Sequence, residues 1–296
     1  ARGGTVVVLT KPDRAQLLGA IQKHRVTEFF LPPTVIYRLL DIPDLGKVDF
    51  SSLKYFLYGA APMSVEKLKQ AIGTFGPVMM GGYGQTEAPT SISFLTPGEH
   101  FSAGQLTSDE RLSSVGRPNP LVRVEIMNDA SEILPPGETG EICVRGDLVM
   151  KGYYKVPEKT AETIVDGWLH TGDIGHLDAD GYLHITDRKK DMIITGGFNV
   201  YPSEVEQVIW SHPAVQDCAV IGVPDEHWGE AVTAVVELNA GQQVGADELI
   251  ALCKDRLGSV KAPKSIEFVD SLPRSPIGKV LKKDLRAKYW QNVDRR

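Results

Sequence analysis

The chain has 296 residues, of which 42% are apolar and 24% are charged. This balance is typical of a globular protein and argues against a disordered, collagenous or coiled-coil chain. Thirty-two basic residues against 38 acidic ones give a formal net charge of -6, the wrong sign for a protein that lives on nucleic acid or anionic lipid. At roughly 150 residues per domain, the length predicts about two domains.

Targeting and cysteine patterns predict a cytoplasmic protein. No segment approaches the ~18 uninterrupted apolar residues of a membrane span, and no signal peptide opens the chain. Cys143, Cys218 and Cys253 lie far apart in apolar segments, which predicts buried thiols rather than zinc ligands or disulfides. The sequence starts without methionine and runs almost at once into apolar residues, so we expect it to be part of a larger fold.

The first third of the chain alternates strand and helix patterns. Strands are predicted at residues 5–9, 26–31, 53–58 and 78–80, and helices at residues 13–24, at 34–40 and from Ser64 onward. We expect Asp13 and Ser64 to be helix N-caps. A strand and a helix repeating about every 25 residues predict a parallel sheet with right-handed crossovers. Chemistry in such sheets collects at the carboxyl ends of strands, here the predicted loops at residues 59–62 and 81–87.

The apolar period changes to two after about residue 114. Val122, Val124 and Ile126 alternate with polar residues, and turn-forming clusters follow, which predicts a small antiparallel sheet or barrel ending near Asp187. After the charged run at residues 187–191 the pattern becomes mixed. Strands are predicted there at residues 192–195, 215–223, 231–238 and 265–269, and helices at residues 203–210, 247–257 and 281–290.

These patterns together predict an α/β protein with three parts. They are a parallel α/β domain (residues 1–113), a small β-barrel subdomain (114–189) and a C-terminal α+β domain (190–296). On the last helix we expect a solvated basic face, made of Lys282, Lys283, Arg286 and Lys288.

Several common catalytic motifs are missing from the sequence. It has no G-x-x-x-x-G-K-[ST] phosphate loop, no G-x-G-x-x-G, no H-E-x-x-H and no G-x-S-x-G. Hydride transfer, zinc hydrolysis and serine acyl transfer therefore lose their usual sequence support.

Five other motifs, in order along the chain, resemble those of the adenylate-forming superfamily. This superfamily of AMP-dependent synthetases and ligases includes acyl-CoA synthetases, adenylation domains of peptide synthetases and beetle luciferases. The motifs are G-A-A-P at Gly59 to Pro62, Y-G-Q-T-E at Tyr83 to Glu87, G-W-L-H-T-G-D at Gly167 to Asp173, D-R-K-K-D-M-I at Asp187 to Ile193 and P-R-S-P-I-G-K at Pro273 to Lys279. The chain is most similar to an acyl-CoA synthetase, and it matches the C-terminal portion of the family's full length.

The resemblance implies a nucleotide site. Tyr83 would stack on the adenine of ATP, with Asp173 and Arg188 on the ribose. Thr86 and Glu87 would hold Mg²⁺ near the triphosphate, because this cation prefers oxygen ligands. The remaining nucleotide-binding positions that the resemblance implies are Gly59, Ala60, Ala61, Pro62, Gly84 and Gln85.

The resemblance also implies residues for the two chemical steps. Lys279 would stabilise the charge that develops when a carboxylate attacks the α-phosphate of ATP. Lys190 would be the hinge about which the C-terminal domain rotates, and Gly196 and Gly197 would line the channel for CoA. The expected reaction is ATP-dependent ligation of a carboxylic acid to CoA through an acyl-adenylate, as in fatty acid metabolism.

The sequence departs from the family pattern upstream. The Ser/Thr/Gly-rich phosphate loop and its lysine do not occur here, so we expect a fragment of a protein of ~500 residues that cannot by itself adenylate at a normal rate. The resemblance implies an acyl pocket around Leu31 to Ile36 and Gly81 to Tyr83, and this part of the sequence is apolar with no obvious charge for the ammonium of an amino acid. It favours a fatty or aromatic acid. Alternatives are an adenylation module that loads a carrier protein, a non-catalytic nucleotide-binding fragment, and a luciferase-like oxygenase, which has no extra support.

Overall fold

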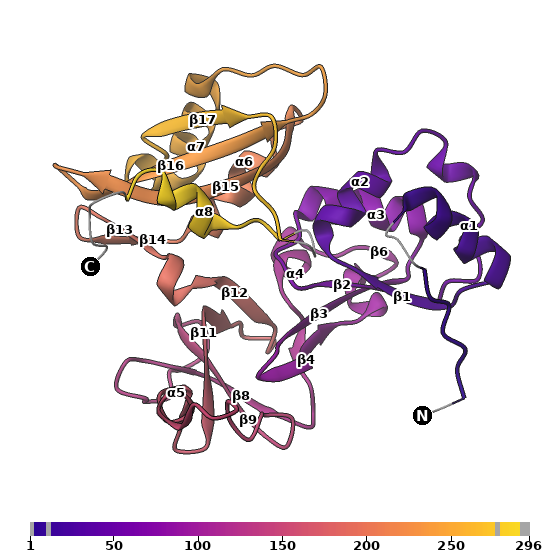
Figure 1. Cartoon of the computed structure of the whole chain (residues 1–296), viewed down its shortest axis with the longest axis horizontal. Coiled ribbons are helices and arrows are strands. Elements are labelled where there is room, and N and C mark those ends of the chain that lie inside the picture. The colour runs from indigo at the N-terminus through magenta and orange to yellow at the C-terminus, as the bar shows by residue number, and fades with distance from the viewer. Residues whose placement is uncertain (1–2, 10–12, 276–278, 291–296) are drawn as a thin grey trace.

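The computed structural model describes residues 3–9, 13–275 and 279–290. Three five-stranded sheets follow one another along the chain, and Figure 1 shows them as three lobes coloured from indigo through magenta to orange. Within the described ranges, none of the helices has the length and apolar character needed to cross a bilayer.

The first sheet has the strand order β1-β2-β3-β4-β7. Strands β1, β2 and β3 pair in parallel, and β4 pairs antiparallel with both of its neighbours, β3 and β7. Helix α2 lies between β1 and β2 and helix α3 lies between β2 and β3, as the alternating pattern predicts, whereas α1 precedes β1. The elements of this lobe are α1 (Arg14–His24), β1 (Glu28–Leu31), α2 (Pro33–Leu40), η1 (Leu45–Lys47), β2 (Tyr55–Gly59), α3 (Val65–Phe75), β3 (Met79–Gln85), β4 (Ala88–Leu95), η2 (Pro97–His100), β5 (Phe101–Ser102), β6 (Gln105–Leu106), α4 (Asp109–Ser113) and β7 (Arg117–Pro118).

Both predicted N-caps are present in this lobe. The Asp13 side chain accepts from the Gln16 amide, and the Ser64 side chain accepts from the Lys67 amide. Each bond satisfies a backbone donor that the helix cannot pair internally. The lobe's core includes fully buried Phe56 from β2 and Leu68 from α3.

Two expectations for the first lobe are wrong. Residues 5–9 form no strand, and Val6 and Val8 are 82% and 80% exposed, because among the described residues no neighbouring strand pairs with their backbone. The predicted loop at residues 81–87 is largely strand, since β3 continues to Gln85 and turns back into β4. Its glycines allow close packing against β2 and so conceal the strand pattern.

The second sheet is antiparallel, as the period-two pattern predicts. Strands pair in the order β8-β9-β11-β12, with β10 also on β11, and among the described residues β8 and β12 are not paired with each other. A turn at residues 178–181 joins β11 to β12. The elements are β8 (Arg123–Met127), β9 (Gly140–Arg145), α5 (Pro157–Thr163), β10 (Ile164–Val165), β11 (Trp168–Leu177) and β12 (Leu183–Arg188).

The third sheet has the order β14-β13-β16-β15, with β17 parallel to β16. Alternate residues of β15 point to opposite faces. Cys218 and Val220 pack with α6 and α7, whereas Ala219 and Ile221 pack with Leu285 of α8. The elements are η3 (Lys189–Asp191), β13 (Ile193–Thr195), β14 (Phe198–Val200), α6 (Pro202–Trp210), β15 (Val215–Asp225), β16 (Gly229–Leu238), α7 (Ala246–Lys261), β17 (Ser265–Val269) and α8 (Lys282–Ala287).

The expected solvated face of the last helix is wrong in part. Lys283 and Lys288 are exposed, but Lys282 pairs with Glu206 of α6 at 2.7 Å and Arg286 pairs with Asp191 at 2.7 Å. The helix is also shorter than predicted and ends at Ala287. Acidic partners distant in sequence draw two of its basic side chains inward, and a helical pattern carries no information about them.

Candidate nucleotide site

The ends of β2 and β3 bring two of the predicted motifs together. Gly59 is the register partner of Gly82, and a Cβ at Gly59 would lie 2.4 Å from the Gly82 carbonyl oxygen. Ala60 follows with a φ of 66°, a conformation that costs energy for a residue with a side chain. The turn continues through Ala61 and Pro62. The close approach at Gly59 thus requires glycine and sets the turn beside the strand that carries Tyr83.

Asp173 is the centre of the site. The Tyr83 hydroxyl donates to Asp173 Oδ2 at 2.6 Å, and Arg188 Nε lies 2.6 Å from Asp173 Oδ1. Asp173 and Tyr83 are 3% and 8% exposed, whereas the Arg188 side chain is 38% exposed. Burial raises the pKa of Asp173, while Arg188 and the Tyr83 hydrogen bond oppose this shift.

The strand pairing explains why these groups meet. Asp173 on β11 and Arg188 on β12 are direct cross-strand partners, next to an irregularity in the register. The Thr171 hydroxyl donates to the Ile142 carbonyl at 2.7 Å and accepts from the Asp173 amide at 3.1 Å. The Gly172 amide, in a residue with a φ of 71°, donates to Glu141 at 3.0 Å. The T-G-D segment is therefore held at every residue.

Lys279 lies close enough to this centre to interact with it electrostatically. Partial burial and the charge of Arg188 lower the pKa of Lys279, and the charge of Asp173 opposes them. The Lys279 amide donates to the Ser275 hydroxyl at 3.1 Å, and the Ser275 amide donates to the Lys279 carbonyl at 2.8 Å. Two ion pairs hold Arg274 at the base of this loop, at 2.8 Å to Asp217 and 3.1 Å to Glu237. Gly278 lies outside the described residues.

Thr86 and Glu87 form the turn between β3 and β4. Thr86 is exposed, and Glu87 Oε1 accepts a hydrogen bond of 2.6 Å from the Tyr153 hydroxyl. Within the described residues, histidine, cysteine and acidic side chains nowhere gather in groups of three or more that could hold a metal ion. One carboxylate and one hydroxyl still fit Mg²⁺, which takes most of its ligands from phosphates and water. Gly84 and Gln85 precede the turn at the end of β3.

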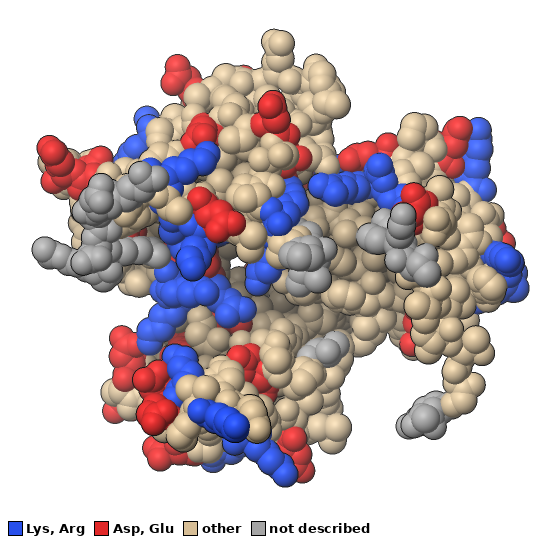
Figure 2. Space-filling model, viewed as in Figure 1, with Lys and Arg blue, Asp and Glu red and all other residues tan. Residues whose placement is uncertain are grey.

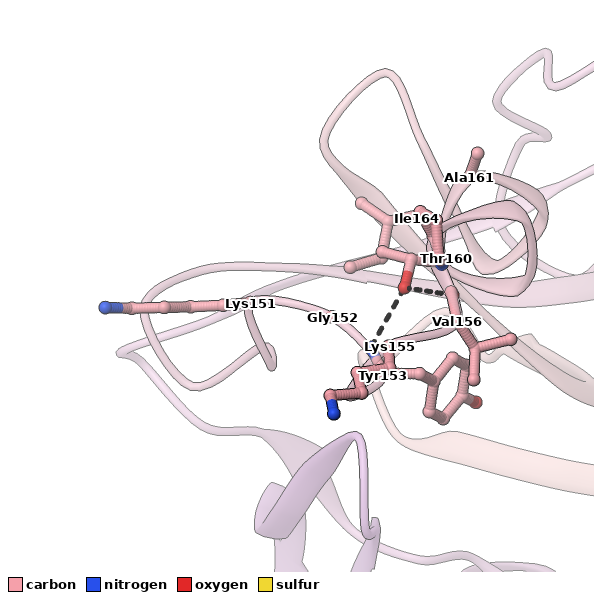
Figure 3. Close-up of a pocket in the computed structure, with 9 residues that line it drawn as sticks. Lys151, Gly152, Tyr153, Lys155, Val156, Thr160, Ala161 and Ile164 are labelled. Atoms are coloured by element: carbon pink, nitrogen blue, oxygen red, sulfur yellow. Dashed lines mark hydrogen bonds between the residues drawn. The ribbon is translucent and has the colours of Figure 1, made fainter.

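A shallow pocket of about 540 Å³ is lined by residues between Lys151 and Ile164, and Tyr153 is one of them. Figure 3 shows Tyr153 in its wall, with the Tyr153 amide and the Val156 carbonyl both bonded to the Thr160 hydroxyl. The pocket adjoins the Glu87 turn through Tyr153 and is not centred on Asp173. Its lining fixes the backbone that carries the Tyr153 ring.

The predicted hinge residue lies just before the third sheet, and the two glycines predicted to line the CoA channel lie within the third lobe. Lys190 is exposed in η3, between the second and third sheets. Gly196 and Gly197 make the turn between β13 and β14, with φ angles of 56° and 83°. A Cβ on Gly196 would lie 2.7 Å from a ring carbon of Trp228. In Figure 2, blue Lys and Arg side chains border the opening between the lobes.

The structure thus brings Tyr83, Asp173 and Arg188 into contact, with Lys279 within electrostatic range, and it sets Gly59 beside Gly82. It keeps Thr86 and Glu87 on their own turn, and Gly196 and Gly197 on another hairpin. Tyr153 and Glu141, which hold Glu87 and Gly172, are not among the site residues that the sequence predicts. Their only sequence signal is proximity to turns, and it does not indicate a partner.

Two family models match the chain. The AMP-binding enzyme model covers residues 1–154, and the model of the AMP-binding enzyme C-terminal domain covers residues 204–279. The chain belongs to the AMP-binding enzyme family. This confirms the resemblance inferred from the motifs.

Known members of the family are similar over nearly the whole chain. A medium/long-chain-fatty-acid–CoA ligase of Mycobacterium tuberculosis is 46% identical over 99% of this chain and 52% of its own length. The amide bond synthetase McbA of Marinactinospora thermotolerans is 42% identical, with a TM-score of 0.91 over 97% of this chain and 58% of that one. The chain therefore spans little more than half the length of these relatives.

A third relative has been solved in two states. ATP-bound MatB of Rhodopseudomonas palustris is 35% identical, with a TM-score of 0.86 over 97% of this chain and 55% of that one. Apo MatB, with the same identity and coverage, has a TM-score of 0.73. Over the whole chain, the TM-score is therefore higher against the ATP-bound form than against the apo form.

Proposed function

We propose that this chain provides the adenosine-binding and lysine-bearing parts of an AMP-forming carboxylic acid–CoA ligase. The observation that carries the proposal is the convergence of Tyr83 and Arg188 on the buried carboxylate of Asp173, with Lys279 within electrostatic range of it. The TM-score is also higher against ATP-bound MatB than against apo MatB, which supports a nucleotide-binding role.

Asp173 is suited to a ribose. Each carboxylate oxygen can accept two hydrogen bonds, and the protein supplies one contact to each. One acceptor position on each oxygen is thus left for the 2′ and 3′ hydroxyls. Burial raises the pKa of Asp173, and the charge of Arg188 opposes this rise and so favours the ionised carboxylate, which is the stronger acceptor. Tyr83 and the turn at Gly59 to Pro62 would lie against the adenine.

Lys279 would act in the first chemical step. An oxygen of the substrate carboxylate attacks the α-phosphorus of ATP, the bond to pyrophosphate breaks, and an acyl-adenylate forms. Two anions approach each other in this step, and the ammonium of Lys279 offsets their repulsion. In the second step the sulfur of CoA attacks the acyl carbon, its proton goes to solvent, and AMP leaves.

Glu87 and Thr86 would hold Mg²⁺ with the phosphates. The ion, when bound, neutralises charge on the leaving pyrophosphate. The Tyr153 hydroxyl donates to Oε1 of Glu87, which would leave Oε2 for the ion.

We further propose the domain division 1–113, 114–189 and 190–296, with Lys190 as the hinge. Rotation about it would exchange the Lys279 loop for the turn of Gly196 and Gly197, which then faces CoA. A ligase that consumes ATP and CoA would work in the cytoplasm, where both are abundant. The apolar residues of the expected acyl pocket, around Leu31 to Ile36 and Gly81 to Tyr83, favour a fatty or aromatic acid as the substrate.

The isolated chain would adenylate poorly, because the family's loop for the β- and γ-phosphates is not in its sequence. A second candidate function differs in the acyl acceptor. McbA, at 42% identity, is named an amide bond synthetase, so an amine could replace CoA in the second step. A carrier-protein thiol is a further acceptor, and a non-catalytic nucleotide-binding fragment is the alternative without chemistry.

Acid-dependent exchange of pyrophosphate into ATP tests the proposal. It is measured with a panel of fatty, aromatic and amino acids, on this chain and on the longest protein that the encoding DNA allows. We expect exchange in the longer protein only, abolished by Lys279→Ala and retained in Lys283→Ala, whose lysine is exposed on α8. Exchange in neither protein would favour the non-catalytic alternative. Products with CoA, a carrier protein or an amine then identify the acceptor.

A further inference from the structure

The segment that joins β12 to β13 is held from two opposite sides. On its first side, Lys189 Nζ lies 2.7 Å from Asp129 Oδ1 and 3.5 Å from Glu141 Oε2. Glu141 belongs to β9, and Asp129 lies in the turn after β8. Lys189 is therefore attached to the lobe of the second sheet.

Two residues further on, the segment is held by the third lobe instead of the second. Asp191 Oδ1 lies 2.7 Å from Nη1 of Arg286, and both side chains are largely buried, at 14% and 13% exposure. Burial alone would raise the pKa of Asp191, but the hydrogen bond and charge of Arg286 outweigh it and lower this pKa. Arg286 lies on α8 beside Leu285, which packs under the third sheet. Asp191 is therefore attached to the third lobe.

The helix that holds Asp191 also begins just after Lys279. Lys282, at the start of α8, forms its ion pair of 2.7 Å with the buried Glu206 of α6. Lys279, α8 and Asp191 consequently belong to the third lobe. Lys190 joins this lobe to Lys189, so it sets the position of the lobe.

We propose that Lys189 and the Asp191–Arg286 pair are positioning groups that confine rotation between the second and third lobes to the single residue Lys190. The proposal deepens the proposed function and rests on it for the purpose of that rotation. The ion pairs of Lys189 and Arg286 lie within one body each, so they persist while the lobes move.

Other contacts cross the boundary and would have to break. The Ser203 amide, in the first turn of α6, donates to Asp187 Oδ2 at 2.8 Å, and the Ser203 hydroxyl donates to the Thr186 carbonyl. The amide of Gln207 reaches the Met63 carbonyl at 3.4 Å, and Gln216 reaches Asp41 at 3.2 Å. These polar contacts stabilise the observed orientation of the third lobe. Rotation at Lys190 would break them, while the ion pairs of Lys189 and Asp191 would stay intact.

Amide hydrogen exchange of the intact chain tests the proposal without nucleotide or acid. The readout is a peptide that spans residues 187–193, where the Met192 amide donates to the Arg188 carbonyl at 3.2 Å. Lys189→Gln and Arg286→Ala each release one attachment, so exchange in this peptide should rise about fivefold, while peptides from β15 and β16 keep their rates.

Conservative and matched variants separate positioning from general stability. Arg286→Lys should restore the slow exchange, because only Nη1 of Arg286 contacts Asp191 and, among the described residues, Nε and Nη2 have no hydrogen-bond partner. Lys288→Ala, which breaks an exposed pair with Glu267, and Lys159→Gln, which breaks one with Glu162, should leave the peptide unchanged.

Two results would overturn the proposal. One is unchanged exchange at residues 187–193 in Lys189→Gln. The other is faster exchange in Arg286→Ala that spreads equally through β15 and β16, which would mean that the pair only stabilises the third lobe. Neither result depends on catalysis, so pyrophosphate exchange remains a separate test of the proposed function.

Discussion

The hydroxyl of Tyr83 donates a hydrogen bond of 2.6 Å to Asp173, a residue 90 positions later in the chain. This contact joins the first sheet to the second at the point where Arg188 also reaches the carboxylate. Three side chains from two lobes thus share one buried negative charge, and the following predictions depend on that arrangement.

Removing the Tyr83 hydroxyl should separate the contribution of its hydrogen bond to stability from the contribution of its ring to AMP binding. Tyr83→Phe leaves Asp173 Oδ2 without its donor, so the free energy of unfolding should fall by about 2 kcal/mol, as for hydrogen bonds to charged groups. The ring remains, so AMP affinity should change less than in Tyr83→Ala. Denaturant unfolding and AMP titration measure the two effects.

Tyr58→Phe is the matched control for this change. Its hydroxyl contacts His100 Nε2 at 3.1 Å and is equally buried, but the contact lies away from Asp173. It should lower stability while leaving AMP affinity unchanged. Equal losses of AMP affinity in Tyr83→Phe and Tyr58→Phe would contradict a specific role for the Tyr83–Asp173 contact.

The pH dependence of nucleotide binding should report on Arg188. Burial raises the pKa of Asp173 and the charge of Arg188 lowers it, so Arg188→Ala should raise this pKa further. Because ribose binding uses the ionised carboxylate, AMP affinity of the variant should be lost at a higher pH on acidification than affinity of the parent chain. At neutral pH we expect affinity to be about tenfold weaker.

Arg123→Ala controls for the loss of a positive charge, because Arg123 pairs with Glu125 on the outside of β8. Its AMP affinity should follow the pH profile of the parent chain. A profile for Arg188→Ala that coincides with the parent's would show that Asp173 does not bind nucleotide as a carboxylate.

Tyr153 should influence magnesium without touching nucleotide. In Tyr153→Phe, Glu87 loses the donor to Oε1 and its carboxylate is free to rotate. The Mg²⁺ concentration needed for half-maximal ATP binding should rise about tenfold, as when other outer-shell partners of metal ligands are removed. The neighbouring variant Tyr154→Phe, at a side chain 85% exposed, should show no rise. A rise of equal size in both variants would argue against the Tyr153–Glu87 contact as the cause.

The Lys282–Glu206 pair should be a major contributor to the stability of the third lobe. Lys282→Met leaves Glu206 buried without its counter-ion, so unfolding free energy should fall by about 3 kcal/mol. Lys283→Met, one residue later and exposed, should have little effect. Adding Glu206→Gln to Lys282→Met should recover part of the loss, because residue 206 then carries no buried charge. If the double variant is the less stable one, the cost lies in packing rather than charge.

Local patterns in the sequence determined much of this fold. β17 occupies residues 265–269 as predicted, and α1 and α3 begin after the predicted caps Asp13 and Ser64. Caps and alternating apolar residues act over a few positions, so their signals are complete within a short stretch. The order of the five motifs likewise identified the family before any contact was known.

Only the tertiary structure decided which side chains meet. The strand predicted at residues 5–9 is absent from the sheets, because a strand requires a neighbour that its own residues do not specify. Lys282 looked like one more solvated lysine until α8 placed it beside Glu206, and Tyr153 gained a role only through Glu87, 66 residues earlier. Ion pairs and hydrogen bonds of this kind depend on distances set by packing of the whole chain, whereas periodicity depends on neighbours along it.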